Sequence, residues 1–143
     1  MKKNIILLAL LTLSACSSYG PVTRSVDEDL QSGYSSGYLS ERVRLSFGGN
    51  QEIKGVNLGP ADVKKNNRYD RKDPDWEVNE ACRKSFVEAA AALQQKALNI
   101  GGNAVVRICS RLKHDTFCDS ALYYCQGGKT KSAVTLHGTI VKE

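Results

Sequence analysis

The stretch from Pro74 to Val106 decides the fold, and it reads PDWEVNEACRKSFVEAAAALQQKALNIGGNAVV. Its apolar residues recur every three or four positions, which places them on one face of an α-helix; they are Val78, Cys82, Phe86, Ala89, Leu93, Ala97 and Ile100. Asp73 and Pro74 supply capping chemistry at the start, and Gly101-Gly102 is a typical stop signal. The stretch therefore predicts one long amphipathic helix that leads into a buried strand.

Shorter apolar segments on both sides of this helix predict β-strands. Alternating or continuous apolar runs bounded by glycine cover residues 41–47, 104–109, 121–126 and 133–141. Residues 64–75 instead predict a charged loop that is rich in asparagine. Short connections favour antiparallel neighbours, and one amphipathic helix can cover one sheet. The expected fold is α+β, with one long helix on a small, mainly antiparallel sheet in two layers, stapled by disulfides.

The first fifteen residues have the composition of an export signal. Lys2 and Lys3 form a basic head, an apolar stretch follows, and small residues lead to Cys16. The apolar stretch is too short for a spanning helix, which needs about 20 residues. The run Leu13-Ser14-Ala15-Cys16 matches the bacterial lipobox, in which the cysteine is lipidated and the leader is cut before it. Residues 1–15 are therefore predicted to be a signal peptide, and Cys16 is the predicted lipidation site.

The residues after Cys16 predict a tether and a single folded domain. Ser17 favours the outer membrane by the sorting rule of such lipoproteins. Residues 16–40 are rich in serine, glycine and tyrosine and hold few aliphatic side chains, so they predict a lipidated flexible tether. Residues 41–143 carry the predicted helix and strands and have the length of one α+β globular domain.

The net charge limits the choice of partners. Removal of the leader takes Lys2 and Lys3 and lowers the formal net charge from +5 to +3 over 128 mature residues. This mild charge and the predicted export argue against nucleic acid. The expected partners are the membrane, through the N-terminal lipid, and another envelope protein.

The predicted domain contains four cysteines: Cys82, Cys109, Cys118 and Cys125. An even number in an oxidising compartment indicates two disulfides, and the sequence lacks the closely spaced pairs typical of structural zinc sites. The lengths of the helix and its return strand favour Cys82 with Cys118 and Cys109 with Cys125. The alternative, Cys82 with Cys125 and Cys109 with Cys118, stays open because sequence alone does not determine connectivity.

The sequence has no pattern that indicates catalysis or metal binding. It contains neither a G-x-S-x-G elbow nor a C-x-x-C redox motif. His114 falls in a polar loop, and His137 falls on the strand face opposite Leu136, so both are expected at the surface. The acidic residues from Asp70 to Asp75 lack the glycine and glutamate of a calcium loop. We therefore expect no enzyme activity, no cofactor and no metal site.

Several motifs of the predicted domain are shared with a known family; they are Glu80-Ala81-Cys82-Arg83, Gly101-Gly102-Asn103-Ala104-Val105-Val106, Tyr124-Cys125 and Val134-Thr135-Leu136-His137-Gly138-Thr139. On these motifs the chain, over residues 42–142, resembles a family of small exported bacterial lipoproteins often labelled as excinuclease ABC-like. The label finds no support here, because the sequence has no phosphate-binding G-x-x-x-x-G-K-[ST] loop. The family keeps cysteines that match Cys82 and Cys125, and their pairing would imply the second connectivity.

Two further resemblances are more distant. The Asn-Ala-Val strand after the helix and the four cysteines are similar to those of the outer-membrane lipoproteins that sense stress for the Rcs phosphorelay. The non-consecutive bridges of those lipoproteins imply the first connectivity. The helix, the Gly-Asn-Ala-Val-Val strand and the terminal Gly-Thr strand are also similar to a family of small heavy-metal-binding domains. The shared residues belong to the scaffold, so no binding role is carried over with them.

Together these patterns predict a non-enzymatic, lipid-anchored protein of the bacterial cell envelope, on the outer membrane and facing the periplasm. Its expected role is that of an interaction or stress-sensor-like module. One alternative is a periplasmic domain that binds a small ligand or a metal. The other alternative is a structural housekeeping lipoprotein without a ligand.

Overall fold

The computed structural model describes residues 21–69, 74–128 and 130–143, with the backbone alone for residues 74–76. It contains two helices, α1 (Val26–Ser35) and α2 (Pro74–Asn99). Its strands are β1 (Pro21–Ser25), β2 (Arg44–Phe47), β3 (Val56–Arg68), β4 (Ala104–Leu112), β5 (Asp115–Phe117), β6 (Leu122–Gly127) and β7 (Lys131–Lys142). The predicted α+β class is confirmed.

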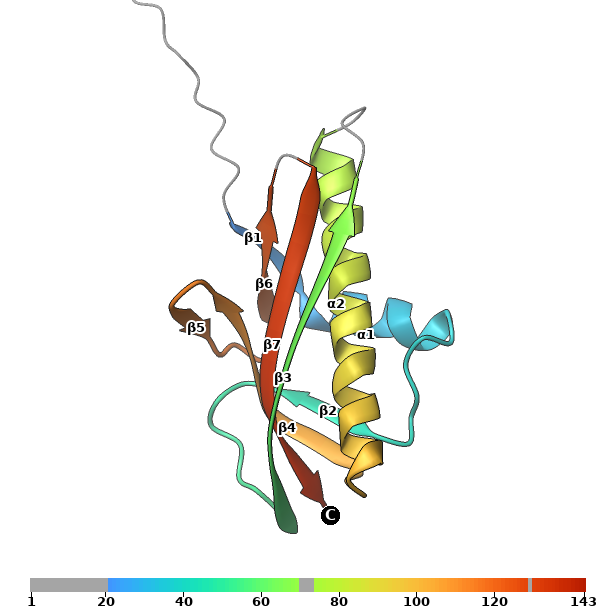
Figure 1. Ribbon diagram of the computed structural model, residues 1–143, viewed down its shortest axis with the longest axis vertical. Coiled ribbons are helices and arrows are strands. Elements are labelled where there is room, and N and C mark those ends of the chain that lie inside the picture. The colour runs from blue at the N-terminus through green and yellow to red at the C-terminus, as the bar shows by residue number, and fades with distance from the viewer. Residues whose placement is uncertain (1–20, 70–73, 129) are drawn as a thin grey trace, which may run out of the picture.

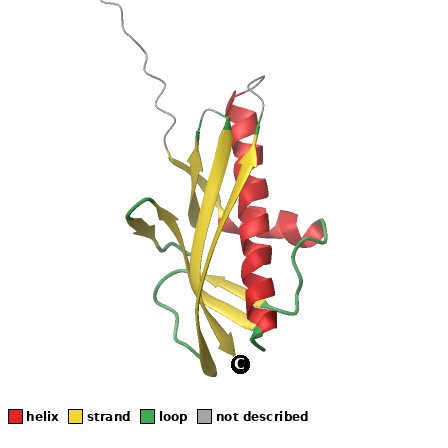
Figure 2. Ribbon diagram, viewed as in Figure 1, coloured by secondary structure: helices red, strands yellow, loops and turns green. Residues whose placement is uncertain are grey.

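The sheet is organised around β7. The strand that pairs with β7 over the greatest length is β3, which runs antiparallel to it. These two strands pair along their whole lengths, from Val56 opposite Lys142 to Arg68 opposite Lys131. On its other side β7 pairs with β6 near its start and with β4 near its end. All pairs are antiparallel except β2, which runs parallel to β4. The helix α2 lies along one face of this sheet, which gives the two expected layers (Figures 1 and 2).

The predicted apolar face of α2 is the helix side of the core. Its residues from Val78 to Ala97 are buried, and they pack against Val134, Leu136 and Ile140 of β7. Ile100 was expected in this row but is 51% exposed, because the helix has already ended. The amides of Gly101 and Gly102 donate to the last turn of α2, and Gly101 has a φ of 82°. This is the C-terminal cap that the glycine pair predicts.

Residues 21–40 differ from the expected tether. They form β1, α1 and a connecting turn, which we call the N-terminal strap, and only residues 16–20 of the predicted tether lie outside the described residues. The strap is poor in aliphatic residues, yet Val26 and Leu39 are both buried in the core. A Cβ on Gly33 would lie 2.6 Å from Leu39, so the glycine permits this close packing. The prediction of a flexible tether from composition was wrong for these residues, because their contacts with distant elements offset the entropy that is lost when they become ordered.

The predicted loop over residues 64–75 is also partly wrong. Strand β3 continues to Arg68, and residues 70–73 lie outside the described residues. The polar residues of this strand are tolerated because β3 is an edge strand, and its register with β7 supplies the backbone hydrogen bonds. Lys64, Lys65 and Arg68 are exposed on it.

The disulfides join Cys82 to Cys125 and Cys109 to Cys118. The pairing favoured from element lengths was therefore wrong, and the alternative pairing occurs. The reason is a β-bulge: between Val106 and Cys109, β4 advances three residues while β7 advances two. The extra residue, Arg107, has a φ of 54°. Such a shift turns the following side chain to the other face, so Cys109 points away from α2 and pairs across the β4–β5 hairpin.

Candidate functional site

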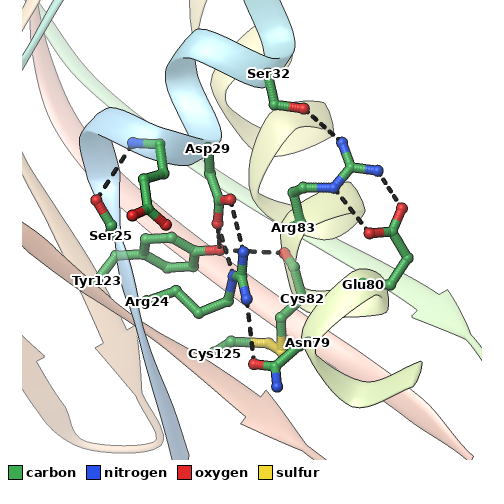
Figure 3. A network of polar contacts seen from close by, with 11 residues as sticks. Arg24, Ser25, Asp29, Ser32, Asn79, Glu80, Cys82, Arg83, Tyr123 and Cys125 are labelled. Carbon is green, nitrogen blue, oxygen red and sulfur yellow. Dashed lines mark hydrogen bonds and ion pairs between the residues drawn. A yellow bond between two sulfur atoms is a disulfide. The ribbon is translucent and has the colours of Figure 1, made fainter. Parts of the chain in front are cut away.

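A buried polar cluster, which we call the strap network, joins the N-terminal strap to the rest of the domain (Figure 3). Its centre is Asp29, which is 1% exposed. Arg24 donates two hydrogen bonds to this carboxylate, at 2.8 Å and 2.7 Å. The Tyr123 hydroxyl donates to the same carboxylate at 2.6 Å and lies 3.4 Å from the carbonyl oxygen of Cys82. Arg24 also donates to Asn79 on α2.

Local sequence and sheet register together position these groups. Arg24 and Tyr123 lie directly opposite each other in the β1–β6 pair, so their side chains share the face that α2 covers. Ser25 then caps α1 by accepting from the amide of Glu28. The cap places Asp29 in the first turns of α1, above the Arg24 guanidinium. Tyr123 is held from the other side by the ring of Phe86, with ring centroids 4.0 Å apart.

The electrostatics of the network favour a charged Arg24 and a neutral Tyr123 near neutral pH. The hydrogen bonds to Asp29 raise the pKa of Arg24 further above its ordinary value, and they outweigh the opposing effect of burial. Burial, followed by the negative charge of Asp29, raises the pKa of the Tyr123 hydroxyl well above its usual range. Arg24 therefore stays charged and Tyr123 stays neutral. The cluster therefore acts as a fixed tie between the strap and the rest of the domain.

Two further ties hold the later part of the strap to α2. Arg83 donates to the Ser32 hydroxyl at 2.7 Å and is paired with Glu80. At the end of the strap, Gln94 accepts from the amide of Ser40 and donates to its carbonyl oxygen, at 2.9 Å and 2.7 Å. The strap is thus fixed at its start, its middle and its end.

The face of the sheet opposite α2 carries a smaller polar cluster. His137 lies on this face, as predicted, with its Nδ1 atom 2.8 Å from the Asp62 carboxylate. Arg111 lies 3.4 Å from the same carboxylate. Sequence reasoning missed Asp62, because its position opposite His137 depends on the unpredicted strand β3. Among the described residues, no serine, threonine or cysteine side chain hydrogen-bonds to His137.

The other features considered from the sequence form no further site among the described residues. Cys16 lies outside the described residues, and His114 is exposed in the turn between β4 and β5. Among residues 21–69, 74–128 and 130–143, no three histidine, cysteine or acidic side chains gather as a metal site would require. None of the described helices has the length and apolarity to cross a bilayer. One hollow, of about 660 Å³, is lined mainly by polar and charged residues: Arg44, Ser46, Gln51, Glu52, Lys54, Val106 and Glu143.

Comparisons with protein families, curated proteins and solved structures gave no match for this chain. The function must therefore be argued from the residues themselves. The most completely built feature among them is the strap network, which ties the beginning of the folded domain to its disulfide-bonded core.

Proposed function

We propose that this protein is a lipid-anchored, non-enzymatic interaction module of the bacterial cell envelope, attached to the outer membrane through Cys16. The observation that carries the proposal is the use of the five cysteines. Four of them pair in two disulfides. The fifth, Cys16, stands at the end of a leader in the sequence LSAC, where a lipobox cysteine is expected.

The disulfides support export from the cytoplasm. Disulfides of this kind form and persist in oxidising compartments such as the periplasm, and they are rare in the cytosol. Both sulfurs of the first pair belong to cysteines that are 0% exposed. A bridge in the core is part of the fold, so the protein is expected to mature where thiols are oxidised.

The strap network supports a role that depends on position and contact. Only four residues separate Cys16 from Pro21, where the strap begins. Because Arg24 and Asp29 tie this strap to α2 and β6, the folded domain is held within a few residues of the proposed anchor. This arrangement suits a domain that presents a rigid surface to another envelope protein at the membrane, as a stress-sensor-like module does.

The ligand-binding alternative has less support. A thiolate is the metal-binding form of cysteine, and the four cysteines of the domain are bonded to one another. The hollow lined by Arg44 and Glu143 is open and mainly polar, whereas small-molecule sites are mostly apolar with a few convergent polar groups. A metal titration of the purified, oxidised protein tests this alternative; saturable heat would favour it over the interaction module.

The proposal is tested by the variant Cys16→Ser. We expect loss of labelling by radioactive palmitate and release of the protein from the membrane fraction, since removal of the acyl chains removes the anchor. Cys118→Ser, which breaks a bridge but leaves the lipobox intact, is the control and should remain labelled and membrane-bound. If the Cys16→Ser form kept both properties, the proposal would be wrong. Ser17→Asp should redirect the protein to the inner membrane.

The interaction role needs a separate experiment. Photocrosslinking groups introduced at exposed positions of the β4–β5 hairpin, such as His114, should capture one specific envelope protein in living cells. The same group at Lys96 on α2 serves as the matched exposed control. Equal and unspecific capture at both positions would contradict an interaction module and favour a structural lipoprotein.

A further inference from the structure

Four strand ends lie side by side at the end of the sheet where β1 begins with Pro21. Sheet register places Pro21 beside Gln126, Gln126 beside Ala133, and Ala133 beside Asn66. The start of β1, the end of β6, the start of β7 and the end of β3 therefore share one end of the molecule (Figure 1). Three strand spacings, about 14 Å, separate Pro21 from β3 across this row.

Four cations lie close to this level. Arg68 and Lys131 face each other two residues beyond the row, while Lys65 and Lys64 lie one and two residues before it. Two residues of strand correspond to about 7 Å. All four cations are exposed, and none of them forms a salt bridge within the described part of the chain.

The strand rows around these cations carry no opposing charge. Within two residues of the Pro21 level, the four described strands contain no aspartate or glutamate; the segments are Pro21–Thr23, Tyr124–Gly127, Lys131–Thr135 and Lys64–Arg68. Two other cations of the sheet are paired with carboxylates, Arg44 with Glu143 and Arg111 with Asp62. The strands at the end where the chain enters therefore carry only basic charges, and we call the four cations Lys64, Lys65, Arg68 and Lys131 the basic end. On the helix side of these strands, Glu88 accepts from Asn67 at 3.1 Å.

The length of chain before Pro21 limits how far this surface can be from the membrane. Five residue steps from Cys16 to Pro21 span at most about 18 Å even when fully extended. If Cys16 is lipidated, as proposed above, Pro21 is held within little more than two Debye lengths of the lipid headgroups at physiological salt, and the basic end stands beside it. Clustered lysine and arginine side chains at that distance are attracted to anionic lipids.

We propose that the basic end is a docking surface for anionic phospholipid headgroups, with Arg68 and Lys131 making the closest approach. This inference rests on the proposed lipid anchor and adds an orientation to it. The strands β3 and β7 stand with this end toward the bilayer, and the β4–β5 hairpin branches from the sheet about halfway along β7, where Ser110 lies opposite Leu136. The lipid supplies attachment, and the basic end fixes which face of the domain is left free for partners.

The test uses the mature chain with Cys16→Ser, so that headgroup attraction is measured without the anchor. Co-sedimentation at low salt with vesicles of phosphatidylglycerol, and separately of phosphatidylcholine, gives the partition coefficients. We expect binding to phosphatidylglycerol alone. The pair Arg68→Gln with Lys131→Gln should lower the coefficient about 25-fold, at a factor of roughly five for each charge near the surface. Added inorganic phosphate should displace no more protein than chloride at equal ionic strength.

The matched control is Lys54→Gln with Lys142→Gln, which removes two exposed cations at the opposite end of the sheet. We expect it to change the coefficient less than about twofold, because those charges lie beyond the screening length. Thermal unfolding and circular dichroism verify that both variants fold. Equal losses in the two variants, equal binding to both lipids, or specific displacement by phosphate would each overturn the inference. Because the assay contains no acylated protein, its failure is distinguishable from failure of the Cys16 experiment.

Discussion

The N-terminal strap and the β4–β5 hairpin are both attached to the body of the domain, but by opposite means. Buried groups hold the strap: Asp29 is 1% exposed, and the tyrosine that binds it stands next to the core disulfide of Cys125. A peripheral bridge to the exposed Cys118 closes the hairpin. Its other support is ring stacking of Phe117 on Tyr124, with centroids 4.1 Å apart.

This difference indicates how each region responds to load or to a partner. A buried charged group is stable only when all its partners are present, so the strap is either fully docked or lost as a unit. The hairpin has few buried groups and can deform at lower cost. The strap is thus the more rigid region, and the hairpin is the more adaptable one.

The largest expected effect comes from removing the core disulfide with Cys82→Ala and Cys125→Ala. This bridge closes a loop with a sequence separation of 43. The chain-entropy relation gives a loss of about 4 kcal/mol in the free energy of unfolding. Urea unfolding of the oxidised protein measures it. A loss no greater than that from removing the hairpin bridge would contradict the stronger attachment expected of the buried region.

Asp29→Ala should follow, with a loss of about 3 kcal/mol, because it leaves Arg24 and the Tyr123 hydroxyl without their shared acceptor. This value lies at the lower end of the range for removing one partner of a buried ion pair, because the Arg24 side chain is 19% exposed and can turn toward water. Hydrogen exchange should show β1 and α1 opening first. Asp27→Ala, on the exposed side of the same helix, is the control and should cost less than about 1 kcal/mol. If Asp29→Ala and Asp27→Ala lowered the free energy of unfolding equally, the strap network would not be what holds the strap.

The hairpin bridge should have a smaller effect. Cys109→Ala with Cys118→Ala opens a loop with a separation of 9, for which the same relation gives about 2.5 kcal/mol. In the wild-type protein, mild reductant should open this bridge before the core bridge, because Cys118 is exposed whereas Cys82 is 0% exposed. Peptide mapping during reduction checks the order, and simultaneous loss of both bridges would be the contrary result.

The smallest effect is expected at the surface pair of Glu80 and Arg83. The hydrogen bond from Arg83 lowers the pKa of Glu80, so the pair stabilises the fold above the unfolded-state pKa of about 4.3. That contribution is lost as the pH falls through the lower folded-state pKa. Since the side chains are about a third exposed, Glu80→Gln should cost at most about 0.5 kcal/mol at neutral pH. Thermal unfolding at pH 7 and below pH 4 measures the difference, which should shrink in acid.

Much of the fold was predictable from local patterns, and the site was not. The α2 face, its capping glycines and the strands after it followed from periodicity. The sequence pattern missed β1, α1 and most of β3, because their residues are polar and become ordered only through pairing with distant strands. It also missed the strap network, since Asp29 and Tyr123 are 94 residues apart. No local signal marks a carboxylate that will be buried by partners so far along the chain.

By itself the sequence determined the helix from Pro74 to Asn99 and the presence of a covering sheet, and it predicted the export signal that ends at Cys16. Each of these depends on neighbouring residues: a 3.6-residue period, an end signal, or a short motif. Only the tertiary structure decided that the strap docks and that Cys82 bonds to Cys125. The physical reason is that one bulge at Arg107 turns Cys109 away from the helix, and burial of Asp29 requires four elements to meet.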